Sequence, residues 1–202
     1  SIHIAGTASQ DNLDLLGTKF PSLVITADQI INYFKFADPE VERIVAQYWG
    51  DGTGTSLEQI QAITDIGSKF RGNTLIETFD EFEKFKSVTF STYSEGVFSD
   101  CSSLTSIKLP KHLTTIPANF AKNSTMESDI TGCFENTTFI GRNAFLNTRI
   151  YGELNLPKIA DLESAQNSNF KNTNISKAII GGTVSIIPAS CFENCANLNE
   201  VI

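Results

Sequence analysis

The chain has 202 residues, of which 41% are hydrophobic and 19% are charged, a composition typical of a folded globular protein and not of a disordered one. Its formal net charge is −8 and its Lys and Arg residues are scattered, which argues against nucleic-acid binding because phosphate contacts need clustered cations. No apolar run approaches the roughly 20 residues that a membrane-spanning helix needs.

The first 25 residues show no clear hydrophobic period, and we expect residues 1–25 to form an irregular tether. The sequence begins at Ser1, without an initiating Met and without a signal peptide. This start suggests a processed or trimmed chain, from which a targeting segment could have been removed, so it is no evidence for a cytoplasmic location.

Residues 26–72 predict a helical lead-in. The phrase Thr26-Ala-Asp-Gln29 has the form of a capping box, and the apolar residues behind it predict a helix over about residues 27–37. Asp38-Pro39 predicts the start of a second helix, with Asp as the N-cap and Pro at the first helical position, where no N–H is missed. This second helix should end before Gly50.

Two further capping boxes follow. Ser56-Leu-Glu-Gln59 predicts a third helix that stops at Gly67, and Thr78-Phe-Asp-Glu81 predicts a short fourth helix rich in phenylalanine. We expect the fourth helix to cap the repeats, which we assign to residues 73–202, because an uncovered end of such a stack exposes apolar surface and unpaired strand edge. Residues 87–90 are expected to form the first strand.

A phenylalanine returns at nearly fixed intervals of 22, 25, 25 and 22 residues through the second half of the chain. A period of about 20 to 29 residues predicts a leucine-rich-repeat solenoid, in which each coil is buried only by its neighbours. We therefore predict an α+β repeat fold, a stack of short parallel strands preceded by a small helical cap. The repeating residues are Phe98, Phe120, Phe145, Phe170 and Phe192.

The strand phrase over residues 104–110 alternates aliphatic and polar residues, which sends Ile107 and Leu109 inward and their neighbours outward. Similar phrases precede Pro157 and Gly181. The outward residues form the candidate binding surface: Ser106, Lys108, Glu153, Asn155, Lys177, Ile179 and Glu200. A plain solvated strand face explains the same residues equally well, because their charges are mixed and no aromatic cluster marks a hot spot.

The turn after each phenylalanine carries Cys, Asn or Thr, whose side chains can reach backbone groups that the turn leaves unpaired. These residues are Cys101, Asn123, Asn147 or Thr148, Asn172 and Cys195. At about 4.8 Å per strand, the four repeats between Cys101 and Cys195 separate them by roughly 20 Å, beyond the ~7 Å that a disulfide spans. We therefore expect all four cysteines to be free and mostly buried.

The phrases at residues 97–110 and 191–195 resemble those of the BspA-like leucine-rich repeat family of bacterial surface proteins. Residues 36–82 also resemble the helical lead-in of bacterial members, so the resemblance covers most of residues 36–202. It implies a secreted or lipid-anchored extracellular protein without catalytic activity. Some members are thought to bind proteins of the host or of neighbouring cells as adhesins, although no defined binding residues carry over.

Related lead-ins can hold an EF-hand-like calcium loop at the position of residues 49–57. Neither frame of this loop, starting at Gly50 or at Asp51, places enough carboxylates at the ligand positions, so we expect a degenerate loop without metal. The carboxylates Asp80, Glu81 and Glu83 are expected to be a solvated face, since no His or nucleophile accompanies them. We expect neither a cofactor nor enzymatic activity.

Two functional hypotheses remain open. The first is a non-enzymatic surface solenoid that binds a protein, or alternatively a glycan, on a host or neighbouring cell. The second is a structural spacer or assembly module of a longer surface protein. Residues 198–202 begin a new strand phrase and stop without a polar cap, which predicts self-association through this C-terminal edge or continuation in a longer parent.

Overall fold

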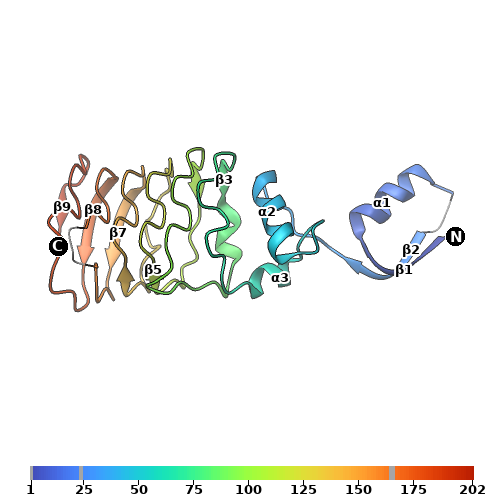
Figure 1. Cartoon of the computed structure of the whole chain (residues 1–202), viewed down its shortest axis with the longest axis horizontal. Helices are drawn as coiled ribbons and strands as arrows, with labels where there is room; N and C mark the ends of the chain where they lie inside the picture. Colours follow the sequence, from blue (N-terminus) through green and yellow to red (C-terminus); the bar gives the residue numbers. More distant parts are fainter. Residues whose placement is uncertain (1, 23–24, 164–166) are drawn as a thin grey trace.

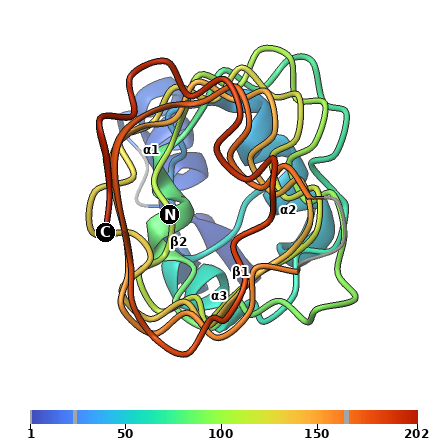
Figure 2. The ribbon, with the colours of Figure 1, turned by 90° about the vertical axis from the view of Figure 1, so that its left-hand side faces the viewer.

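The computed structural model describes residues 2–22, 25–163 and 167–202. Along its long axis lie a small unit formed by β1, α1 and β2, then helices α2 and α3, and then a stack of coils that reaches the C-terminus (Figure 1). Seen along this axis, the coils superimpose around one core (Figure 2). The predicted solenoid of stacked parallel strands is confirmed.

The N-terminal unit consists of β1 (Ile2–Ser9), α1 (Gln10–Lys19) and β2 (Ile25–Ile31), with the two strands parallel. Ser9 caps α1 by accepting a hydrogen bond from the backbone N–H of Asn12. Among the described side chains of this unit, the buried hydrophobic one is that of Leu13.

This unit overturns two expectations. Residues 1–25 are not an irregular tether, because β1 and α1 occupy most of them. The helix expected over residues 27–37 is wrong, because β2 runs to Ile31 and Thr26 pairs with His3 in the strand register. The capping-box pattern around Thr26 is local, whereas the strand depends on a partner 23 residues upstream that a local pattern cannot reveal.

The two lead-in helices are α2 (Pro39–Trp49) and α3 (Leu57–Ala62). Helix α2 has Asp38 as its N-cap and Pro39 as its first residue, and it ends before Gly50, as predicted. Helix α3 has the predicted reciprocal capping box between Ser56 and Gln59. It is shorter than expected, because its C-cap residue Ile63 is already extended, well before Gly67.

The stack begins with β3 (Thr78–Phe79) and the 3-10 helix η1 (Asp80–Lys84). The expected capping box at Thr78 does not form: Thr78 belongs to β3 and η1 has no side-chain cap. Residues 87–90 are not a strand, so the first strand lies one segment earlier than expected. Phe79, Phe82 and Phe85 are all fully buried, because rings spaced three apart on this tight turn fill the end of the core.

Two ladders of short parallel strands run along the stack. The first contains β3 paired with β4 (Ser106–Ile107), and then β7 (Tyr151–Leu156), β8 (Asn174–Ile180) and β9 (Glu200–Val201) in that order. The second contains β5 (Thr115–Ile116) paired with β6 (Phe139–Ile140). Between β4 and β7 the backbone of residues 127–130 continues the first ladder by hydrogen bonds to both neighbours.

The recurrent phenylalanines lie in one row. Ring centroids of successive residues from Phe98 to Phe192 are 5.4 to 5.7 Å apart, as the repeat predicts. The row also extends to Phe70, whose ring centroid lies 5.5 Å from that of Phe98. These contacts tie the lead-in and the coils into one continuous hydrophobic core that runs from Phe36 to Cys191.

The turns after the phenylalanines contain two rows of polar side chains where the sequence suggests one. In the first row, Cys101, Ser124, Thr148, Thr173 and Cys195 are buried, and each donates to a backbone carbonyl. In the second row, one position earlier, the backbone has a φ of 58° to 62° at Asp100, Asn123, Asn147, Asn172 and Asn194. The sequence pattern predicts Asn123 and Asn172 at the same turn position as Cys101 and Cys195, whereas the structure places them one position earlier in the turn. The spacing of the phenylalanines does not reveal this offset of one residue.

The second row is a side-chain ladder. Each asparagine Nδ2 donates to the Oδ1 of the residue one coil earlier, over 2.5 to 3.1 Å, from Asn194 to Asp100. Asn and Asp tolerate the left-handed backbone better than other non-glycine residues, which explains why they occupy this position. All four cysteines are free and three are buried, as predicted. Burial raises the pKa of Cys101 to about 11.

Candidate functional site

The predicted binding surface lies on the first ladder, where the strands pair its charged residues with one another. The strand register places Lys177 between Glu153 and Glu200. The Nζ of Lys177 lies 2.9 Å from Glu200 Oε2, and this hydrogen bond raises the pKa of Lys177. Asn155 and Ile179 are opposite each other on the same strands. These five residues therefore form one contiguous patch.

The remaining two predicted residues lie at the other end of the ladder. Ser106 Oγ donates to Asp80 Oδ1 over 2.6 Å, and Lys108 Nζ lies 3.5 Å from Asp80 Oδ2. Between them and the first patch lies the irregular coil with Asp129, which bridges to Tyr151 of β7. The backbone N–H and hydroxyl of Thr131 lower the pKa of Asp129 by hydrogen bonding. The structure therefore splits the predicted set into two groups on one continuous face.

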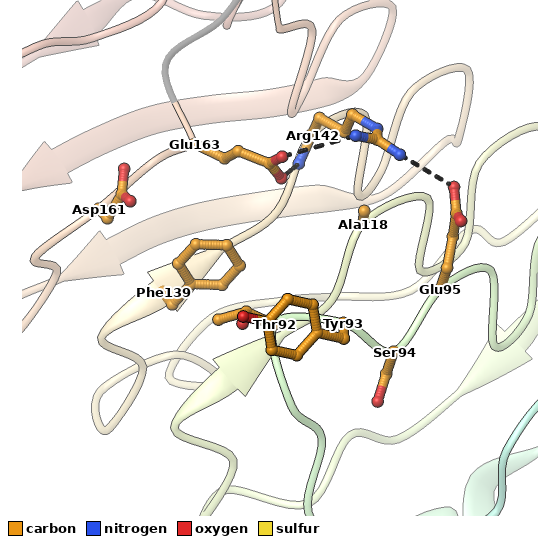
Figure 3. Close-up of a pocket in the computed structure, with 9 residues that line it drawn as sticks. All are labelled: Thr92, Tyr93, Ser94, Glu95, Ala118, Phe139, Arg142, Asp161 and Glu163. Carbon is orange, nitrogen blue, oxygen red and sulfur yellow. Dashed lines mark hydrogen bonds and ion pairs between the residues drawn. The ribbon is translucent and has the colours of Figure 1, made fainter.

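A second candidate site lies beside the second ladder, where sequence reasoning did not look. It is a groove of about 560 Å³ that we call the Arg142 groove (Figure 3). Its walls come from four segments that are brought together by coiling. The lining residues are Thr92, Tyr93, Ser94, Glu95, Ala118, Phe139, Arg142, Asp161 and Glu163.

A charged network closes one side of the Arg142 groove. The guanidinium of Arg142 lies between two carboxylates, with Nη2 3.3 Å from Glu95 Oε1 and Nη1 3.7 Å from Glu163 Oε1. The backbone N–H of Arg142 also donates to Glu163 Oε2 over 2.6 Å. Asn119 Nδ2 donates to Glu95 Oε1 over 2.6 Å. The Arg142 side chain is thus held in place by its two acidic neighbours.

The opposite side of the groove is aromatic. Tyr93 is 95% exposed, although a tight turn holds its backbone: its N–H donates to Ser91 Oγ, and Ser94 N–H donates to Ser91 O. Phe139 lies between Tyr93 and Asp161 (Figure 3), and its backbone bridges to that of Asp161 in the parallel ladder. Among the described residues, the Asp161 carboxylate has no hydrogen-bond or ion-pair partner.

The sequence gives one weak signal for this groove, the tyrosine between Ser and Thr residues near position 93. Phe139 falls outside the phenylalanine spacing of the repeat, and Glu95 and Glu163 are separated by more than two repeats. Their convergence on Arg142 depends on the lateral position of each coil, which no local pattern encodes. Sequence reasoning could place only residues that follow the dominant strand phrase.

The loop after α2 is closed by its own contacts. Asp51 Oδ1 accepts the N–H groups of Thr53 and Gly54 over 2.9 and 3.0 Å. Asp51 Oδ2 accepts a hydrogen bond from the hydroxyl of Tyr33. This hydrogen bond holds the pKa of Asp51 below its usual range. A Cβ at Gly54 would lie 2.4 Å from the Tyr33 ring, so the loop packs on this ring. In the described part of the chain no group of three His, Cys, Asp or Glu residues could hold a metal ion.

The carboxylates of η1 are engaged in contacts within the protein and are not simply a solvated face. Asp80 bonds Ser106, as described above, and Glu81 Oε1 accepts the backbone N–H of Ala37 over 2.9 Å. Glu83 pairs with Lys84 over 2.8 Å, which lowers the pKa of Glu83. Glu81 thus contacts the lead-in and Asp80 the next coil, roles that their sequence pattern does not reveal.

A family model described as "BspA type Leucine rich repeat region", with six copies, matches residues 55–151 and 133–202. Neither the curated proteins nor the solved structures contain a match to this chain. The family match begins upstream of residue 73, and the division of the chain into domains stays a prediction. Within the described residues, every helix is too short or too polar to cross a bilayer.

Proposed function

Because the chain belongs to the BspA-type leucine-rich repeat family, we propose that it is an adhesin-like module that recognises a protein partner outside the cell. Proteins of this family are repeat proteins that are typically found at the cell surface, and leucine-rich repeats generally mediate protein–protein interaction without catalysis. The proposed partner is a protein of the host or of a neighbouring cell, and a glycan is the alternative.

The observation that carries this proposal is the continuous outward face of the first ladder. Strands β7 and β8 hold Glu153, Asn155, Lys177 and Ile179 in fixed register above the fully buried side chains of the same two strands. A surface on a rigid core loses little conformational freedom when a partner binds, so more of the contact energy is retained as affinity. This is the property that an extended recognition surface needs.

The test is a binding screen with the full 202-residue chain. We expect saturable binding to at least one extracellular protein and about tenfold weaker binding for Lys177→Glu, which reverses the charge at the centre of the patch. The matched control is Lys19→Glu, since Lys19 is exposed on α1, far from the repeats. Failure to bind any matrix protein, cell-surface protein or glycan would count against the proposal. Equal losses for both variants would exclude this face as the binding surface.

The second candidate function, an assembly module, is favoured by the surface at the last coil. Strand β9 is an edge strand of its sheet, and Val201 and Ile202 are 50% and 62% exposed. Such an edge presents unpaired backbone groups to another chain. Self-association would appear as concentration-dependent mass in light scattering, and Val201→Lys should abolish it. A strict monomer at high concentration would rule out edge pairing of this chain.

The proposal includes an extracellular location, either secreted or lipid-anchored. It predicts that a protease added to intact cells cleaves the protein, while a cytoplasmic marker stays intact. Protection of the chain until the cells are lysed would contradict this location.

A further inference from the structure

We propose that the Arg142 groove binds a cationic side chain, Arg in preference to Lys, of a protein partner. The inference rests on the proposed function, that this chain recognises proteins, and it identifies the kind of residue that the groove takes. It follows from the charges, aromatic rings and unpaired carboxylate that the groove brings together.

The charge of the groove favours a cation. Three carboxylates, those of Glu95, Asp161 and Glu163, line it with one guanidinium, that of Arg142, which leaves a formal charge of −2. The chain as a whole has a formal charge of −8, so its long-range field also attracts cationic partners. An anionic ligand would meet repulsion at both ranges.

The charge of the groove's arginine is already balanced by its neighbours. Both carboxylates next to Arg142 contact its guanidinium, and its own backbone N–H is bonded to Glu163. The unsatisfied charge is therefore the Asp161 carboxylate, which has no partner among the described residues. A planar guanidinium can donate two parallel hydrogen bonds to such a carboxylate, which a single ammonium cannot.

The aromatic wall completes the recognition of a cation. The ring of Phe139 lies between Tyr93 and the Asp161 carboxylate (Figure 3). A cation held between the carboxylate and these rings gains attraction from the ring faces, and a guanidinium also stacks on them. The Tyr93 ring is 95% exposed on a turn that Ser91 holds. The aliphatic part of the bound arginine side chain would cover this ring.

The test uses the full chain labelled with 3-fluorotyrosine, because it has only four tyrosines. The probe is the tripeptide acetyl-Gly-Arg-Gly-amide, and fluorine NMR follows each ring. The Tyr93 resonance is identified by its loss in Tyr93→Phe. We expect this resonance to shift saturably with the probe, whereas that of Tyr151, which is exposed on the other ladder, does not move.

Two comparisons isolate the charge. The same tripeptide with citrulline, which has the shape of arginine without its charge, should give no saturable shift. Asp161→Asn should weaken binding of the arginine tripeptide about fivefold, in line with the loss of an exposed ion pair. Glu135→Gln is the matched control, because it also removes one exposed negative charge but lies outside the groove, and it should bind as the unmodified chain does.

Three outcomes would overturn the inference. An equal response to arginine and citrulline would show stacking without charge recognition. An unchanged affinity in Asp161→Asn, with Glu135→Gln equally unchanged, would place the cation elsewhere. A response to N-acetyllactosamine but not to the arginine tripeptide would reassign the groove to a glycan. Circular dichroism of each variant confirms that the stack is folded before the comparison is made.

Failure of this inference is distinguishable from failure of the proposed function. If the protein partner binds equally to the unmodified chain and to Asp161→Asn, protein recognition stands and the groove plays no part in it. If the tripeptide binds at Tyr93 while no protein partner is found, the groove is a cation site and the adhesin-like function fails.

Discussion

The N-terminal unit and the repeat stack contain the same kinds of element but differ in what holds them together. In the unit of β1, α1 and β2, Leu13 is the buried hydrophobic residue among the described side chains. In the stack, each turn of chain places a phenylalanine against those of its neighbours, and Phe145 has no exposed surface. The comparison teaches that the parallel strands of the stack draw their burial from neighbouring coils, whereas the β1–β2 pair forms without such neighbours.

Surface contacts reinforce this difference. The continuous core begins at Phe36, and none of the described side chains of the N-terminal unit belongs to it. An ion pair joins Asp11 of α1 to Lys35, in the segment that leads into α2, over 3.2 Å, with both side chains more than half exposed. Pairs of this kind contribute little to stability in water. We therefore expect the two regions to respond independently to mutation, with large effects confined to the stack.

The largest expected effect is that of Phe145→Ala. Phe145 contacts Phe120, Phe134 and Phe170, so its removal leaves a cavity shared by three coils. The free energy of unfolding should fall by about 3 to 5 kcal/mol. Urea denaturation measures this, with Leu15→Ala as the control, because Leu15 is 54% exposed on α1 and should cost less than about 0.5 kcal/mol. Similar losses in both variants would break the comparison.

Asp38→Ala should have the next largest effect. This buried carboxylate accepts N–H groups from Glu40 and Val41 at the start of α2, and from Glu77 and Thr78 at the start of the stack. Its loss leaves these donors unpaired, and we expect a destabilisation of about 2 to 3 kcal/mol.

Asp38→Asn serves to separate the two roles of this residue. An amide keeps one acceptor oxygen for the cap of α2 but loses the second acceptor, which serves Glu77 and Thr78. Hydrogen exchange should therefore accelerate at those two amides more than in α2. A uniform acceleration throughout the chain would show that the lead-in and the stack unfold as one unit.

A smaller effect is expected for the asparagine ladder. Asn147→Gly keeps the left-handed backbone, whose φ is 62°, but removes two side-chain hydrogen bonds, at a cost of about 1 kcal/mol because the side chain is exposed. Asn147→Ala loses the same bonds and also strains the turn, and should cost about 1 kcal/mol more. Thermal unfolding of both variants measures the difference, and equal values would show that the backbone conformation contributes nothing.

The smallest effect is expected from deleting residues 1–31. Because the core starts at Phe36, the stack should keep its thermal midpoint within about 2 °C. A fall of 10 °C or more would mean that the N-terminal unit supports the lead-in, and the contrast between the two regions would then be wrong.

The repeat could be predicted because burial imposes one ring per coil, and this demand is visible in the spacing of Phe98 to Phe192. Helix α2 could be predicted because its N-cap Asp38 and its C-cap Gly50 are local signals. Strand β2 could not, because its partner β1 is distant in sequence and Thr26 can serve equally in a cap or in a strand. The Arg142 groove could not either, since its residues share no period and meet only after coiling.

The side-chain ladder of the turns has a direction. Every amide of the row points its nitrogen toward the lead-in, and the row ends at Asp100, a carboxylate that can only accept. The equivalent place in the preceding coil is Gly72, also left-handed with a φ of 67°, which has no side chain to prolong the series. At the opposite end the Oδ1 of Asn194 is oriented to receive an amide from a coil placed in register beyond it. The two ends of this series are therefore unlike, and a further coil in register would extend it at Asn194 and not at Asp100.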